Sequence, residues 1–241
     1  MTNSMTTINI EKKLEPIFNN ISEIEKLNQE KVLQAFRDHS VSDSDFNPTT
    51  GYGYDDYGRD KLERVYASIF GAEDALVRPQ IVSGTHAITI ALFGVVRPGD
   101  ELMYITGEPY DTLTQVIGAR SHSPGSLTDF GVLYQSIPLH NEKVDLDAVK
   151  AKMSEKTKVI AIQRSKGYDE RPSITIHEME EIIRTIKSWN KDIIIFVDNC
   201  YGEFVEAYEP TDIGADIIAG SLIKNPGGGI ARSGGYIVGK N

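Results

Sequence analysis

Five consecutive apolar residues, 193–197, form a run in which no polar side chain alternates with an apolar one. A strand with one solvated face alternates apolar and polar residues, whereas a strand of a parallel sheet is covered by helices on both faces and stays apolar. The run therefore predicts a strand buried inside a parallel sheet. Similar short runs, separated by segments with helical spacing, recur along the chain and predict an α/β fold: a mostly parallel sheet with helices on both faces.

The predicted elements alternate along most of the chain. Strands are expected at 75–77, 101–106, 132–137, 159–163, 193–197, 217–219 and 235–238. Helices are expected at 60–70, 85–95, 111–119, 146–153 and 176–189. We interpret 51–241 as one large domain. Because the sequence ends directly after a strand, we also expect a smaller C-terminal domain, absent here, to follow in the complete protein.

The first 50 residues are expected to form an N-terminal helical arm. Apolar residues recur at three-to-four spacing over 8–38, which predicts an amphipathic helix. Pro16 is expected to mark a helix start, because proline is tolerated in the first turn and not in the interior. The apolar face would pack on the chain's own domain or on a partner subunit.

Composition excludes several classes of protein. A net charge of -10 over 241 residues argues against nucleic-acid binding, which usually shows a basic face. No apolar run approaches the roughly 20 residues of a membrane span, and the first residues do not resemble a signal peptide. A single cysteine, Cys200, excludes an intramolecular disulfide. These features favour a cytoplasmic enzyme that acts on a small molecule, with no membrane or nucleic-acid partner and no metal site.

Two polar residues follow neighbouring strands of the predicted sheet. Asp198 ends the strand 193–197, and Lys224 lies just past the strand 217–219. Ligands of open α/β sheets bind at the carboxyl ends of strands, where both residues are expected. Pyridoxal 5'-phosphate needs this pair, because a lysine amine forms the Schiff base and an acidic partner keeps the pyridine nitrogen protonated.

Two further segments fit the same cofactor. Ser83, Gly84 and Thr85 precede the helix expected at 85–95, and a helix N-terminus with a glycine favours a phosphate group. Tyr110 follows the strand 101–106 and could stack on a cofactor ring. Taken singly, a serine here is often only a helix cap and such a lysine is often solvated. Their order at the ends of successive strands favours a cofactor site.

The chain resembles the fold-type I pyridoxal-phosphate enzymes of cysteine and methionine metabolism, the cystathionine lyase and methionine gamma-lyase group. It is most similar to the branch described as aluminium-resistance or methionine gamma-lyase-like proteins. The resemblance rests on the segments 51–63, 82–87, 197–204 and 220–229.

The resemblance implies a role for each site residue. Lys224 would carry the Schiff base, Asp198 would pair with the pyridine nitrogen, and Tyr110 would stack on the ring. The turn Ser83–Thr85 and Ser221 would bind the phosphate. It also implies a homodimer or homotetramer, in which residues of the neighbouring subunit complete the phosphate site; the nearest matches are Tyr57 and Arg59.

The sequence departs from the family pattern at two places. Ile223 stands where the cystathionine enzymes have a phosphate-binding threonine. The segment 163–168 occupies the loop that offers an asparagine to the ring hydroxyl, and either Arg164 or Ser165 could reach the ring instead. The arginine that grips the substrate carboxylate is expected in the C-terminal domain.

The resemblance implies a carbon–sulfur lyase that acts on a sulfur-containing amino acid by β- or γ-elimination. A transaminase or an aldolase of the same fold would use the same ring-binding residues. A non-catalytic protein that binds a phosphate ligand is a further alternative, although mere binding does not need Lys224 opposite a carboxylate.

Overall fold

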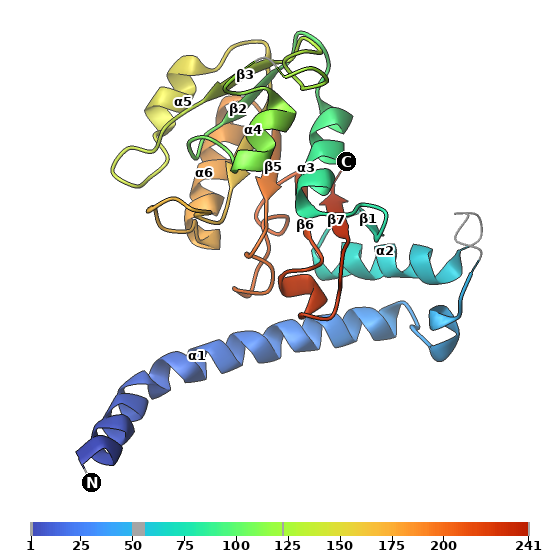
Figure 1. Ribbon diagram of the computed structural model, residues 1–241, viewed down its shortest axis with the longest axis vertical. Helices are drawn as coiled ribbons and strands as arrows, with labels where there is room; N and C mark the ends of the chain where they lie inside the picture. The colour runs from blue at the N-terminus through green and yellow to red at the C-terminus, as the bar shows by residue number, and fades with distance from the viewer. Residues whose placement is uncertain (1, 50–55, 122, 241) are drawn as a thin grey trace.

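A seven-stranded sheet forms the centre of the computed structural model, which describes residues 2–49, 56–121 and 123–240 (Figure 1). Its strands are β1 (Asp74–Arg78), β2 (Glu101–Tyr104), β3 (Leu133–Ser136), β4 (Thr157–Gln163), β5 (Ile194–Asp198), β6 (Ile217–Ser221) and β7 (Gly235–Gly239). The helices are α1 (Thr2–Asp38), α2 (Tyr57–Ile69), α3 (Gly84–Val95), α4 (Asp111–Ile117), α5 (Leu146–Lys152) and α6 (Ile176–Trp189), with short 3-10 turns at Asp43–Phe46 and Asn225–Gly227.

The strand order is β1-β7-β6-β5-β4-β2-β3. Strand β7 is antiparallel to both of its neighbours, and the pairings β6·β5, β5·β4, β4·β2 and β2·β3 are all parallel. Parallel neighbours need a crossover connection. Helices α4, α5 and α6 lie in the connections from β2 to β3, β3 to β4 and β4 to β5, and a long loop joins β5 to β6. The predicted mostly parallel sheet is confirmed.

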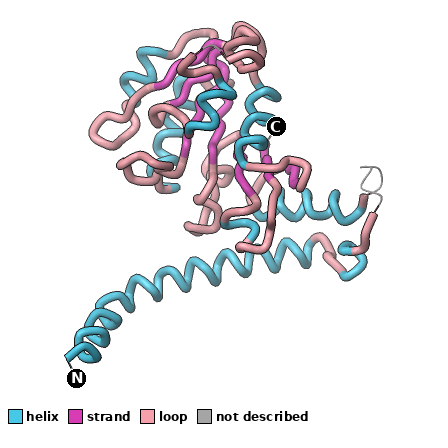
Figure 2. The backbone as a smooth tube through the Cα atoms, in the orientation of Figure 1, coloured by secondary structure: helices cyan, strands magenta, loops and turns pink. Residues whose placement is uncertain are grey.

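Helices cover both faces of the sheet. One apolar core lies between the sheet and α3 and α4, and includes Leu92, Leu113 and Phe196. A second core lies on the opposite face against α2, α5 and α6, and includes Val65 and Ile183. Figure 2 shows the strands enclosed between the two helical layers. The central strands β4, β5 and β6 are mostly apolar because both of their faces are buried.

The N-terminal segment forms one long helix, α1, which extends away from the sheet (Figure 1). Pro16 lies inside this helix, so the prediction that it marks a helix start is wrong. Proline removes one backbone hydrogen bond and favours a bend. The helix tolerates it because this half lies free of the sheet, and α1 bends along its length (Figure 1).

The second half of α1 is fixed to the domain by polar contacts. The amide nitrogen of Asn28 donates to the carbonyl oxygens of Phe204 and Glu206 at 3.1 and 3.0 Å. Lys31 donates to the carbonyl of Ala207 at 3.1 Å. The division into an arm, 1–50, and a domain, 51–241, stays a prediction, and its boundary lies outside the described residues. Within the described ranges, no helix is long and apolar enough to cross a membrane.

Candidate active site

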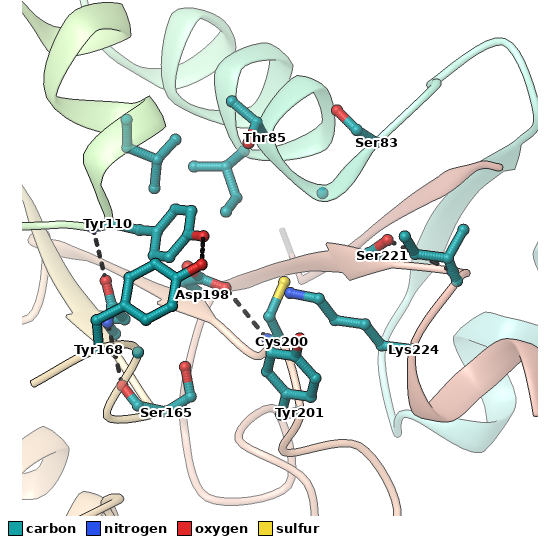
Figure 3. Close-up of a pocket in the computed structure, with 16 residues that line it drawn as sticks. Ser83, Thr85, Tyr110, Ser165, Tyr168, Asp198, Cys200, Tyr201, Ser221 and Lys224 are labelled. Atoms are coloured by element: carbon teal, nitrogen blue, oxygen red, sulfur yellow. Dashed lines mark hydrogen bonds between the residues drawn. The ribbon is translucent and has the colours of Figure 1, made fainter. Parts of the chain in front are cut away.

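A cavity of about 430 Å³ opens at the carboxyl ends of β4, β5 and β6, beside the N-terminus of α3 (Figure 3). Seven of the nine predicted site residues line it: Ser83, Gly84, Thr85, Tyr110, Asp198, Ser221 and Lys224. They come from four separate parts of the chain, which the parallel sheet brings together because its strands end at one edge.

Asp198 is the last residue of β5 and is 5% exposed. Its carboxylate accepts a hydrogen bond from the backbone N–H of Cys200 at 3.1 Å. Burial raises the pKa of the Asp198 carboxyl, while this hydrogen bond and the charge of Lys224 oppose the rise. A cationic group placed beside Asp198 would therefore stabilise the ionised carboxylate strongly, since little solvent screens the pair.

Lys224 follows β6 and extends its side chain into the cavity, where its amine lies beside Cys200 (Figure 3). Burial opposes the ammonium charge, but Cys200 and Asp198 outweigh it and raise the pKa of the lysine. Burial also raises the pKa of the Cys200 thiol. The cavity thus contains the amine of Lys224 and the buried carboxylate of Asp198.

The N-terminus of α3 forms the opposite wall. Ser83 caps the helix, and its hydroxyl accepts from the backbone N–H of His86 at 3.1 Å. Space beside Gly84 is tight, because a Cβ there would lie 3.1 Å from the Cβ of Ser221 and 3.2 Å from the sulfur of Cys200. The first N–H groups of a helix have no partner within it and favour an anion. This wall is suited to a phosphate group.

Ser221 and Ile223 both line the cavity next to Lys224. The Ser221 hydroxyl accepts from the backbone N–H of Ile223 at 3.4 Å. The Ile223 side chain is 53% exposed. It supplies no hydroxyl to the cavity. Thr85 adds a hydroxyl to the same wall and pairs with Thr112 at 2.8 Å between their oxygens.

Tyr168 is a residue of this site that the sequence analysis missed. Its hydroxyl accepts from the hydroxyl of Tyr110 at 3.1 Å, and the two ring centroids are 5.4 Å apart (Figure 3). This hydrogen bond raises the pKa of Tyr110. The backbone N–H of Tyr110 also donates to the side-chain oxygen of Gln163 at 2.9 Å. The Gly-Tyr pair at 167–168 was visible in the sequence, but the fold of its loop was not.

Of the two residues suggested for the ring hydroxyl, Ser165 lines the cavity and Arg164 does not. Arg164 turns away because its guanidinium is held by the side chains of Asn199, at 2.9 Å, and Glu206, at 2.7 Å. The suggestion of Arg164 is therefore wrong. Gln163 does line the cavity, but its amide is engaged by Tyr110 and by the Ser165 carbonyl.

Tyr57 and Arg59 lie on α2, away from the cavity. Tyr57 is 72% exposed, and Arg59 forms an ion pair with Asp56 at 3.1 Å. Both were expected to act in a neighbouring subunit's site, and that role stays a prediction. The rest of the Gly/Tyr-rich segment, 50–55, lies outside the described residues. Within the described chain, no group of three or more acidic, histidine or cysteine side chains could hold a metal ion.

A known family matches this chain over nearly its whole length. The family model for methionine gamma-lyase matches residues 3–241. The chain belongs to the methionine gamma-lyase family. Its fold is that of the fold-type I pyridoxal-phosphate enzymes, as the sequence analysis expected.

Three relatives illustrate the range of similarity. The uncharacterized protein YnbB of Bacillus subtilis is 59% identical over 98% of this chain, which spans 56% of that protein. A solved carbon–sulfur lyase involved in aluminium resistance, from Clostridium novyi NT, is 46% identical with a TM-score of 0.91, covering 95% of this chain and 55% of that one. The L-methionine gamma-lyase of Pseudomonas putida is 31% identical over 74% of this chain and 39% of its own length. This methionine gamma-lyase family chain thus spans a little over half the length of YnbB and of the clostridial lyase.

Proposed function

We propose that this chain carries the pyridoxal 5'-phosphate site of a carbon–sulfur lyase that acts on a sulfur-containing amino acid by β- or γ-elimination. The observation that carries the proposal is the position of Lys224 and Asp198 in one cavity, opposite the N-terminus of α3. Membership of the methionine gamma-lyase family supports it.

The residues present fit this cofactor. The cavity lies within the range of about 300 to 1,000 Å³ found for small-molecule sites. Gly84 leaves room for a bulky anion at the helix N-terminus, since any side chain there would meet Ser221 and Cys200. Asp198 provides the buried carboxylate for the ring nitrogen, and Tyr110 provides an aromatic ring on the cavity wall.

Each residue has a defined task in this proposal. Lys224 would hold the cofactor covalently and, once released by an incoming amino acid, would remove the substrate's α-proton with its Nζ. Asp198 would keep the ring nitrogen charged, which requires the carboxylate to stay ionised in its buried position. Tyr110 would hold the ring in place from the side of the cavity. The cofactor itself would supply the electron sink that stabilises the carbanion.

The site would be completed by a second subunit. Exposed apolar residues lie along the first half of α1, including Ile17, Phe18 and Ile21 at 54% exposure each. Such a stripe is a typical interaction surface. We propose a homodimer or homotetramer in which α1 packs on a neighbouring copy, with Tyr57 and Arg59 directed to its phosphate site. We also propose a cytoplasmic location.

The test is a panel of sulfur amino acids given to the full-length protein. A lyase releases ammonia, a 2-oxo acid and a sulfur compound in equal amounts. Each product is measured separately, with Lys224→Ala as the inactive control. Transfer of the amino group to an added 2-oxo acid, without release of sulfur, would instead show a transaminase. Cofactor attachment without turnover of any amino acid would show a non-catalytic binding protein.

A further inference from the structure

Tyr201 adopts a backbone conformation that tyrosine rarely takes. Its φ is +68°, in the left-handed region, and the same turn contains Phe204 at +62°. Large aromatic residues are rarely found there because the Cβ is crowded, and such strain persists only where the surroundings enforce it. The strained turn follows directly on Asp198, at the end of β5. It is thus part of the site.

The left-handed turn places the Tyr201 ring against Lys224. The amine nitrogen of Lys224 lies 4.1 Å from the ring centroid, which is a cation–π contact (Figure 3). The Tyr201 backbone contributes as well, since its carbonyl accepts from the side chain of Asn225 at 3.2 Å. Tyr201 therefore contacts both the Lys224 amine, through its ring, and the loop that follows Lys224, through its carbonyl.

Three titratable groups act on the amine: Cys200, Asp198 and Tyr201. All three come from the end of β5 and the turn that follows it. Cys200 and Asp198 lie deep in the site, with exposures of 6% and 5%, whereas Tyr201 is 60% exposed. Tyr201 is thus the member of this group that meets the amine from the solvent side.

We infer that Tyr201 is a positioning residue for Lys224: its ring holds the free amine inside the cavity and favours the charged form. A ring face attracts an ammonium group more than a neutral amine, because the attraction depends on the charge. The strained left-handed conformation at Tyr201 directs its ring toward the Lys224 amine. The role rests on the proposed function only in that Lys224 is the reacting amine. The contact itself does not depend on the cofactor.

The contact can be observed by NMR on the full-length protein after the cofactor has been removed. Reductive methylation with ¹³C-formaldehyde labels Lys224, and Lys224→Arg assigns its signal. A methylated amine over an aromatic face resonates upfield, so the parent protein is expected to show a displaced signal. Tyr201→Leu removes the ring at similar volume, and Tyr201→Phe keeps the ring as the matched control.

In Tyr201→Leu the upfield displacement should disappear, and the pKa of the labelled lysine should fall by roughly half a pH unit. Tyr201→Phe should match the parent in both measurements. Tyr201→Asn, whose side chain suits the left-handed region, should lose the displacement without lowering the melting temperature. An undisplaced parent signal, or a Tyr201→Leu protein that matches the parent, would overturn the inference. Neither result would bear on whether the protein is a lyase, because no turnover is measured.

Discussion

Replacement of Glu203 by glutamine tests whether this buried carboxyl, which lies behind the sheet from the site, makes the stability of the protein depend on pH. Glu203 is fully buried, and one carboxylate oxygen accepts from the hydroxyl of Tyr236 at 2.6 Å. Its other oxygen has no hydrogen-bond partner within the described residues. Strand β6 passes directly over the pair, since a Cβ on Gly220 would lie 2.6 Å from the carboxylate. The carboxyl therefore sits behind the strand that leads to Lys224.

Burial raises the pKa of Glu203 from its ordinary 4.5 to about 7, and the hydrogen bond from Tyr236 lowers it only in part. The nearby acids Glu209 and Asp198 add to the rise. The folded protein thus binds this proton more tightly than the unfolded chain does. The resulting stability is fully present below the unfolded pKa, and it is lost as the pH rises through the folded pKa of about 7.

The size of the effect follows from the difference between the two pKa values. At about 1.4 kcal/mol per pH unit, the free energy of unfolding should fall by roughly 2 to 3 kcal/mol between about pH 5 and pH 8 from Glu203 alone. Glutamine is neutral at every pH and resembles the protonated acid. The Glu203→Gln protein should therefore lack this fall.

Denaturant unfolding of the full-length parent and variant over this pH range measures the difference directly. The control is Glu142→Gln, an exposed glutamate, which should leave the pH dependence of the parent unchanged. If the parent and Glu203→Gln lose stability in parallel from low to high pH, then Glu203 is already ionised in the folded protein and the reasoning is refuted.

Three further variants test the site and the arm. Asp198→Asn should keep the cofactor attached and the melting temperature close to that of the parent. It should lower kcat by two or more orders of magnitude, where each tenfold corresponds to about 1.4 kcal/mol of activation free energy. An undiminished rate would exclude Asp198 from the mechanism. Tyr168→Phe removes the hydrogen bond between the Tyr110 and Tyr168 hydroxyls. Tyr110 would then be held less firmly on the cavity wall, so the rate should fall about two- to tenfold. Tyr208→Phe, at an exposed position, is the control, and an unchanged rate for Tyr168→Phe would contradict the role given to this contact. Replacement of both Ile17 and Ile21 by serine removes exposed apolar surface from α1, so the dissociation constant of the subunits should rise at least about a hundredfold. Light scattering across a dilution series measures this change. An unchanged mass at every dilution would exclude α1 from the interface.

Much of the fold could be predicted from the sequence, because a strand that is buried on both faces appears as a continuous run of apolar residues. The run 193–197 is apolar throughout and became β5, shifted by one residue. The same logic placed Asp198 and Lys224 in one cavity, since the carboxyl ends of parallel strands share one edge. Pro16 misled because proline is usually confined to the first turn of a helix, whereas the exposed half of α1 bends and contains it.

The rest of the site depends on loop conformations that leave no periodic pattern in the sequence. The loop carrying Tyr168 is held by the buried Arg171, which donates to the carbonyls of Gln163 and Ser165 at 3.0 and 2.7 Å. The left-handed turn at position 201 could not be predicted, because the residue there is a tyrosine and not a glycine. Arg164 resembled a site residue in the sequence, but the carboxylate that holds it lies far along the chain, at Glu206.

The central claim is that Lys224 binds pyridoxal 5'-phosphate covalently. The full-length protein is incubated with the cofactor and treated with borohydride, which reduces a Schiff base to a stable bond. Proteolysis and mass spectrometry then identify the modified lysine. The account predicts one pyridoxyl group, on the peptide that contains Lys224, and none in Lys224→Ala. A pyridoxyl group on a different lysine, or a parent protein that carries none after incubation with the cofactor, would contradict it.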